Sequence, residues 1–64
     1  MPWNPDRLRK ARNRRGWTQQ ELADRVDAHK ISVARWELGT RQPRIDELEK
    51  LAKALRVKVT DLLR

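Results

Sequence analysis

Cysteine, tyrosine and phenylalanine are absent from this chain of 64 residues, which contains only two glycines and one histidine. Without cysteine, the chain can form neither a disulfide nor a zinc site built on thiolates. No apolar run approaches the length of a signal sequence or a membrane span, so we expect a soluble, untargeted protein. The sequence also lacks a glycine-rich phosphate loop and a paired acid–base constellation. We therefore expect no enzymatic activity, and the sequence predicts no metal ion, cofactor or small-molecule ligand.

Basic residues are in clear excess. The chain has 16 Lys and Arg residues and nine Asp and Glu residues, which give a formal net charge of +7 at pH 7. So large a charge on one small domain predicts a polyanionic partner. On composition alone, the alternative is a basic protein whose charges are simply solvated. Residues 1–64 are expected to form a single domain, near the lower size limit for folding unaided.

A first helix is predicted to run from Pro5 to about Arg15. Asn4 is a good N-cap, and proline fits the first helical position. Trp3, just before the cap, is expected to pack on the helix as a hydrophobic staple. Gly16 suits the left-handed residue that follows a helix.

Two further helices follow closely. Thr18 and Glu21 form the T-x-x-E capping box that opens the second helix. The third helix is predicted from about Lys30 to Leu38, and Gly39 ends it. Too few residues separate these two helices for an antiparallel pair, so they must cross steeply, as in a helix-turn-helix.

The C-terminal part of the chain predicts two more helices. The fourth carries an apolar stripe at helical spacing that we assign to the core: Ile45, Leu48, Leu51, Ala52 and Leu55. The segment "VTDLL" predicts a short fifth helix capped by Thr60. No strand pattern competes, so the predicted fold class is all-α, a compact bundle of five short helices.

The third helix has two different faces. When it is wound at about 100° per residue, Val33 and Trp36 point inward with Glu37 beside them. The opposite face is small at its centre and basic at its edges, and carries Ile31, Ala34, Arg35 and Leu38, flanked by Lys30. An isoleucine on this face is either a single exposed hydrophobe of no consequence or a contact for the C5 methyl group of thymine.

Several motifs occur in order between residues 8 and 63. They are T-Q-x-E-L-A at 18–23, R-W-E at 35–37, Gly39, Pro43 and L-A-K-A-L at 51–55. With these motifs at this spacing, the chain resembles the lambda-repressor-like helix-turn-helix family, also called the XRE or Cro/repressor family. The resemblance implies a DNA-binding domain whose helix-turn-helix is formed by the second and third helices.

The resemblance also implies roles for single residues. Base edges in the major groove are expected to be read by Lys30, Ile31, Ala34 and Arg35. Phosphate contacts are implied for Gln19, Arg41 and Arg44, and a structural ion pair for Arg12 with Glu37. Two more phosphate contacts stay open, namely a second hydrogen bond from Arg12 and a contact from His29, which otherwise caps the third helix.

Three positions depart from the family pattern. Asp27 stands in the turn where glycine is usual, and aspartate tolerates the left-handed conformation better than most residues. Leu38 stands where asparagine is common, so one phosphate contact of the relatives is not expected here. His29 replaces the usual serine or threonine, so a weak cap is expected at the third helix.

The remaining aromatic and basic residues have simpler interpretations. Trp17 and Trp36 occupy positions that are apolar in relatives, so we assign both to the core rather than to base stacking, and leave Trp3 open. The basic run "RKARNRR" at 9–15 is expected to attract DNA over a distance, since its apolar side is too narrow for a membrane-surface helix.

Together these features predict a sequence-specific regulator of transcription, a repressor, that binds double-stranded DNA. Because one recognition helix reads only about four or five base pairs, we expect a homodimer on a near-palindromic operator that pairs weakly in solution. Its contacts are assigned to Val57, Val59 and Leu62. We expect a cytoplasmic, nucleoid-associated protein of bacterial or phage origin. The alternative is a protein-interaction module of the same fold, an antitoxin or a bridging factor, in which DNA binding is secondary.

Overall fold

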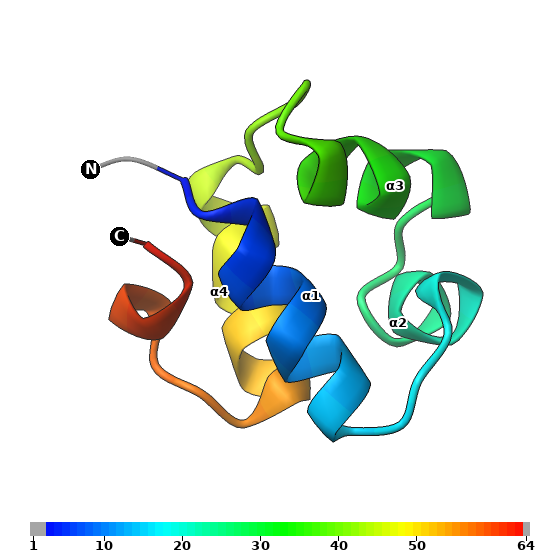
Figure 1. Ribbon diagram of the computed structural model, residues 1–64, viewed down its shortest axis with the longest axis horizontal. Coiled ribbons are helices and arrows are strands. Elements are labelled where there is room, and N and C mark those ends of the chain that lie inside the picture. The colour runs from blue at the N-terminus through cyan, green and yellow to red at the C-terminus, as the bar shows by residue number, and fades with distance from the viewer. Residues whose placement is uncertain (1–2, 64) are drawn as a thin grey trace.

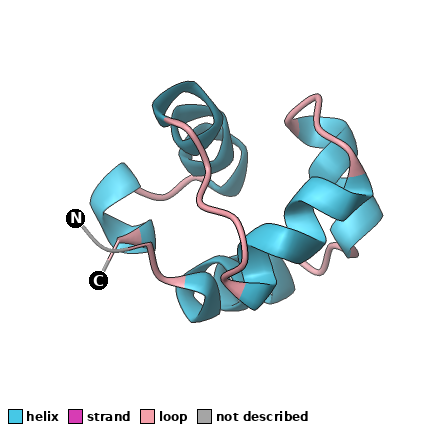
Figure 2. Cartoon of the chain, turned by 90° about the horizontal axis from the view of Figure 1, so that it is seen from above, coloured by secondary structure: helices cyan, strands magenta, loops and turns pink. Residues whose placement is uncertain are grey.

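The computed structural model describes residues 3–63. Four α-helices follow one another along this part of the chain: α1 (Pro5–Arg14), α2 (Gln19–Arg25), α3 (Lys30–Leu38) and α4 (Ile45–Leu55). Figure 1 shows α3 along one edge of the molecule with α2 beneath it, and both chain ends on the opposite side. Helices and loops account for the described residues, with no strand among them (Figure 2). The all-α prediction is confirmed.

The predicted five-helix count is wrong. Val59–Leu62 forms one turn of 3-10 helix, η1, because its backbone hydrogen bonds span three residues, from Asp61 N–H to the Lys58 carbonyl at 2.9 Å and from Leu63 N–H to the Thr60 carbonyl at 3.3 Å. The N-cap of this turn is Lys58 rather than Thr60. The carboxylate of Asp61 accepts a hydrogen bond from the backbone N–H of Lys58 at 3.0 Å, which fixes the start of the turn.

The two ends of the chain are tied to each other. The backbone N–H of Asn4 donates to the carbonyl of Leu62 at 3.2 Å. Trp3 and Leu63 form an isolated antiparallel bridge beside it. The Trp3 side chain is half-buried against the core, and its indole N–H donates to the carbonyl of Trp36 at 2.8 Å. Trp3 therefore fastens the N-terminus to the end of α3.

Capping residues start the first two helices as predicted. The Asn4 side chain accepts a hydrogen bond from the backbone N–H of Arg7 at 3.3 Å. At α2, the hydroxyl of Thr18 accepts from the backbone N–H of Glu21 at 3.1 Å, and the Glu21 carboxylate accepts from the Thr18 N–H at 2.8 Å. Each such cap stabilises a helix by about 1 kcal/mol.

Glycines follow two of the helices where the sequence predicts them. α1 ends at Arg14, and Gly16 takes a φ of +73° after it. Gly39 ends α3 with a φ of +80°, and a Cβ atom there would lie 3.3 Å from Cγ of Pro5. The left-handed backbone and the close approach of α1 together favour glycine at this position.

The core is built from residues of every helix and is small. Its buried apolar residues are Leu8, Ala11, Leu22, Ala23, Val26, Val33, Trp36, Leu48, Leu51, Ala52, Leu55 and Leu62. The assignment of Ile45 to this core is wrong, because its side chain is 78% exposed. Ile45 has the correct spacing, but it is the first residue of α4, where neighbouring elements leave its side chain uncovered. No helix within residues 3–63 has the length and apolar character needed to cross a membrane.

The tryptophans divide between core and surface. Trp36 is buried, as predicted. Trp17 is only half-buried, so its assignment to the core is correct only in part. Guanidinium groups cover its ring instead: the Cζ atoms of Arg15 and Arg25 lie 5.1 and 4.2 Å from the ring centroid.

Candidate nucleic-acid interface

The turn between α2 and α3 sets the direction of the exposed helix. α2 stops at Arg25, and Asp27 takes a φ of +53°, the left-handed conformation predicted for the residue that replaces glycine. The backbone N–H of Ala28 then donates to the carbonyl of Ala23 at 2.9 Å and closes the turn. α3 leaves this turn and packs against both α2 and α1, as a helix-turn-helix requires.

α3 is divided into a buried and an exposed face. Its buried side carries Ser32, Val33, Trp36 and Glu37. On the other side, Ile31 is 56% and Leu38 is 75% exposed. Lys30 and Arg35 are exposed and Ala34 is half-buried. Neither Lys30 nor Arg35 is engaged in an ion pair within residues 3–63.

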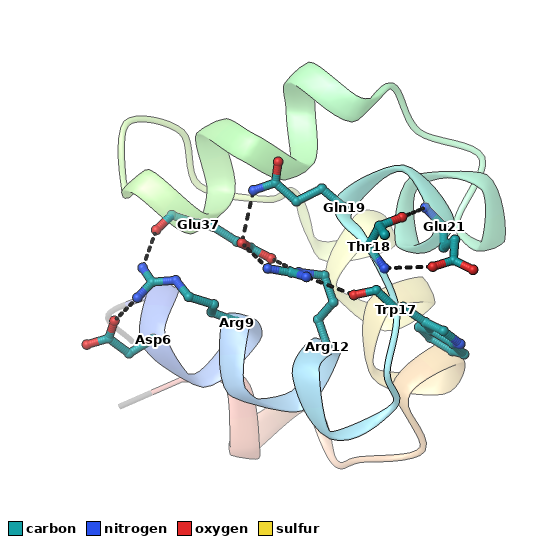
Figure 3. Close-up of polar contacts among 8 residues, drawn as sticks. All are labelled: Asp6, Arg9, Arg12, Trp17, Thr18, Gln19, Glu21 and Glu37. Carbon is teal, nitrogen blue, oxygen red and sulfur yellow. Dashed lines mark hydrogen bonds and ion pairs between the residues drawn. The ribbon is translucent and has the colours of Figure 1, made fainter.

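A polar network beneath α3 holds it in place (Figure 3). The guanidinium of Arg12 binds the Glu37 carboxylate through two hydrogen bonds, Nε to Oε2 at 2.7 Å and Nη2 to Oε1 at 3.1 Å. Arg12 also donates to the carbonyl of Trp17 at 2.8 Å. The predicted ion pair between the first and third helices is thus present. With its side chain 13% exposed and three of its nitrogens engaged, Arg12 serves mainly to position these elements.

Gln19 belongs to the same network. Its Nε2 donates to Oε1 of Glu37 at 3.1 Å, which orients the amide at the N-terminal end of α2 beside α3. Arg9 is a member that sequence reasoning missed. Its Nη2 donates to the backbone carbonyl of Glu37 at 3.1 Å, while its Nη1 lies 3.1 Å from a carboxylate oxygen of Asp6. The basic composition of α1 gave no signal to separate Arg9 from its neighbours.

The loop after α3 carries two of the predicted phosphate contacts. Arg41 is anchored on both sides: Nη1 donates to the Ser32 hydroxyl at 3.3 Å, and Nη2 lies 3.7 Å from the Glu47 carboxylate. Arg44 is exposed; its backbone N–H donates to Oε1 of Glu47 at 2.8 Å, and its carbonyl accepts from the backbone N–H of Leu48 at 2.7 Å. Glu47 therefore fixes both ends of the loop and leaves the Arg44 side chain directed to solvent.

His29 occupies the N-cap of α3 but makes no capping hydrogen bond through its side chain. The weak cap expected from the family resemblance is confirmed. The alternative role, in which the imidazole caps the third helix, is wrong. Its side chain is exposed at the start of α3. There the first turn of the helix offers unpaired backbone N–H groups and a positive dipole end.

The C-terminal residues assigned to a dimer contact separate into two groups. Leu62 is 1% exposed and belongs to the core, so its assignment to a contact with a second copy is wrong. The 3-10 turn directs this side chain inward, where it packs with α1 and α4. Val57 and Val59 are half-buried.

Metal binding finds no support in the arrangement of side chains. Residues 3–63 contain no group of three or more His, Cys, Asp or Glu side chains placed to hold an ion. The site consists instead of a helix with one exposed face, a glutamine at a neighbouring helix start and arginines in the following loop.

This arrangement agrees with the comparison with known proteins. Residues 8–62 match the protein family described as helix-turn-helix. The chain belongs to this family. The control protein C.BamHI of Bacillus amyloliquefaciens is 41% identical to this helix-turn-helix protein over 46 residues, which cover 72% of this chain. The same match covers only 57% of the length of C.BamHI.

Two solved structures share the helix-turn-helix fold over nearly the whole chain. The P22 c2 repressor, in complex with a synthetic operator, has a TM-score of 0.92 at 25% identity and covers 100% of this chain and 97% of its own. The restriction-modification controller protein C.AhdI from Aeromonas hydrophila has a TM-score of 0.87 at 30% identity and covers 92% of this chain and 89% of its own. The predicted membership of the helix-turn-helix family is confirmed by these matches.

Proposed function

We propose that this protein represses transcription by binding a near-palindromic operator as a pair, with one α3 in the major groove of each half-site. The observation that carries the proposal is the exposed face of α3, where apolar and basic side chains stand together without ion pairs to other side chains of residues 3–63. The major groove of B-DNA is about 12 Å wide and admits one α-helix. A helix held by its buried side and exposed on the other fits this role.

The residues on that face suit direct readout of bases. Arg35 presents a planar fork of donors that matches the two acceptors of a guanine edge, and Lys30 can donate to the same groups. Ile31 supplies an apolar surface for a thymine methyl group, which accounts for its 56% exposure. Ala34, between them, is short enough to let the helix approach the base edges closely.

A second set of residues surrounds α3 and suits the phosphate backbone. Gln19 lies at the start of α2, His29 at the start of α3, and Arg41 and Arg44 lie in the loop after α3. Contacts of this kind fix the orientation of a protein on the duplex without reading its sequence. Glu37 holds Gln19 and Glu47 holds Arg41, so both side chains are oriented before DNA arrives.

Pairing on DNA is proposed because a single α3 reads too few base pairs to define one site in a genome. The exposed side of Val57 and Val59 is the proposed contact. Val59 also lines a hollow of about 560 Å³ with Ile45 and Leu63, so the exposed Ile45 extends this apolar surface. Such a surface is small, which agrees with a monomer in solution that pairs on DNA.

Selection of binding sites from a random DNA pool tests the proposal. The selected site should then be retained in a mobility shift with bulk competitor DNA at two salt concentrations. Recovery of a two-part, near-palindromic sequence supports a sequence-reading repressor. Uniform weak binding to all fragments would instead support an interaction module whose main partner is another protein.

Control of a restriction-modification gene pair is a second candidate, because two of the similar proteins are a control protein and a restriction-modification controller. In vitro transcription from a promoter that contains the selected site separates the two possibilities. A repressor lowers the transcript level at every concentration that occupies the site. A controller that activates raises it over part of the range.

A further inference from the structure

A second basic surface lies away from α3. Two adjoining hollows, of about 320 and 360 Å³, share Arg25, Lys53 and Ala54. Together they are lined by five cationic residues, with Trp17 and Ala54 as the only other members: Arg15, Arg25, Lys50, Lys53 and Arg56. We call these seven residues the far basic surface. No carboxylate lines either hollow.

The far basic surface is formed where α1, α2 and α4 end. Arg15 and Arg56 are the C-cap residues of α1 and α4, and Arg25 is the last residue of α2. Figure 1 shows the ends of α1 and α4 at the bottom of the molecule and α3 near the top. In Figure 3 the Trp17 ring points away from α3. No residue of α3 lines the hollows, so this surface and the α3 face can be occupied together.

The charges of this surface are not neutralised by ion pairs in the described part of the chain. The ion pairs within residues 3–63 join Asp6 to Arg9, Arg12 to Glu37 and Arg41 to Glu47, and none of them includes a cation of the far basic surface. Arg15 and Arg25 instead stack against Trp17. Cations near helix C-termini interact favourably with the helix dipole, which offers a purely structural explanation. At Arg56, however, this interaction must offset an unfavourable backbone conformation.

Arg56 has a backbone conformation that disfavours its side chain. Its φ and ψ are 58° and 44°, in the left-handed region, where glycine is the usual C-terminal residue of a helix. For a residue with a Cβ atom this conformation carries a steric cost. A glycine would avoid the cost, and Lys53 already places a cation in the last turn of α4. The strained backbone of Arg56 brings its guanidinium to the lining of a cationic hollow, which indicates a binding role for that side chain.

We propose that the far basic surface binds the phosphate backbone of a second DNA segment while α3 occupies the first, so that one molecule holds two duplexes together. This goes beyond operator recognition and rests on the proposed function only for the first duplex. Phosphates suit the surface because its lining is cationic and open, with only Trp17 and Ala54 as apolar members. A protein partner would require more buried apolar and aromatic area at the centre of the contact.

A capture experiment with the full chain tests the proposal. One random-sequence duplex is fixed to a surface, protein is added, and the retention of a second, fluorescent duplex is measured over a range of salt concentrations. The test variant is Lys50→Gln/Lys53→Gln/Arg56→Gly, whose glycine relieves the left-handed strain and protects the fold. The control variant is Arg7→Glu/Lys58→Gln, because Arg7 lines a separate hollow beside Asp61 and Lys58 is exposed at the start of η1. Both variants lower the net charge by three.

The test variant should bind the first duplex and fail to retain the second. If each replaced cation contacts one phosphate, the slope of log capture against log salt becomes shallower by about 2–3 units. The control variant should retain most of the capture. Equal losses in both variants would reduce the effect to net charge and overturn the proposal. Full capture by the test variant would also overturn it, since paired molecules would then join the duplexes through their two α3 helices.

The alternative partner is an acidic protein segment, and titration of ¹⁵N-labelled protein distinguishes it. Excess duplex should shift the Trp17 indole and Arg56 amide signals after those of α3 are saturated. If poly-glutamate shifts these signals at lower concentration than the duplex does, the surface is a protein site and the assignment to DNA is wrong. Operator recognition is measured separately by site selection, so failure of one proposal is distinguishable from failure of the other.

Discussion

Arg12 and Glu37, 25 positions apart in the sequence, form a nearly buried pair whose side chains are 13% and 4% exposed. Through it, α1 holds the C-terminal part of α3, and Gln19 shares the same carboxylate. The residues proposed to read bases and the residue proposed to grip a phosphate are therefore positioned by one carboxylate. That relationship makes Glu37 the most sensitive position beneath the interface.

Glu37→Ala should lower the free energy of unfolding by about 3–5 kcal/mol, because it leaves the Arg12 charge buried without its partner. Urea unfolding followed by tryptophan fluorescence measures the change. The double variant Arg12→Met/Glu37→Met should lose less than Glu37→Ala, since it leaves no uncompensated charge. If the loss in the double variant equalled the sum of the losses in the single variants Arg12→Met and Glu37→Met, the two side chains would not act as a pair.

Asp27→Gly should keep or raise stability, by up to about 1 kcal/mol, because glycine adopts the left-handed conformation without a steric cost. Asp24→Gly is the matched control: it makes the same chemical change inside α2, where glycine costs about 0.5–1 kcal/mol. Thermal unfolding of both variants checks the prediction. A fall in stability for Asp27→Gly as large as that for Asp24→Gly would mean that the aspartate side chain itself supports the turn.

Asp27 and the Arg12–Glu37 pair illustrate which features the sequence could and could not reveal. The left-handed turn at Asp27, the bounds of α3 and the capping box at Thr18 follow from local backbone chemistry, which short motifs record. The Arg12–Glu37 pair came from resemblance to a family, since no spacing rule connects residues so far apart. Short motifs were insufficient wherever contact with another helix or loop decides which residues a side chain meets.

The errors have the same cause. Ile45 fits the periodicity of α4, but periodicity does not show that neighbouring elements fail to cover the first turn. The assignment of Leu62 to a contact with a second copy fails because the observed 3-10 turn directs its side chain into the core, which the predicted α-helix does not show. The stacking of Arg15 and Arg25 on Trp17 joins two helix ends and a loop, and no sequence pattern predicts such a contact.

Arg44→Gln should weaken binding to all DNA sequences alike, because its exposed side chain is proposed to contact phosphate. The slope of log affinity against log salt should become shallower by roughly one unit. Titrations of the selected site and of a random duplex over a range of salt concentrations measure both effects. Gln42→Ala, in the same exposed loop, is the uncharged control and should leave the slope unchanged. A loss confined to the selected site would assign Arg44 to base readout instead.

Pairing on DNA predicts a strict dependence on the spacing of the two half-sites. Their centres should lie about 34 Å apart, one turn of the double helix. Insertion of half a helical turn, about five base pairs, puts the second half-site on the opposite face and should abolish cooperative binding. Mobility shifts with the original site, the half-turn insertion and a full-turn insertion make the comparison. Binding that ignores the half-turn insertion would mean that each molecule reads DNA alone.

The central claim is that the outer face of α3 reads DNA sequence, and Arg35→Ala tests it most directly. Dissociation constants of the wild-type and variant proteins are measured on the selected site, on its single-base substitutions and on a random duplex at one salt concentration. The account predicts a loss of about 1–3 kcal/mol on the selected site, relaxed discrimination at one base pair, and a much smaller loss on random DNA. An equal loss on the selected site and on random DNA would contradict it, because Arg35 would then be a phosphate contact only.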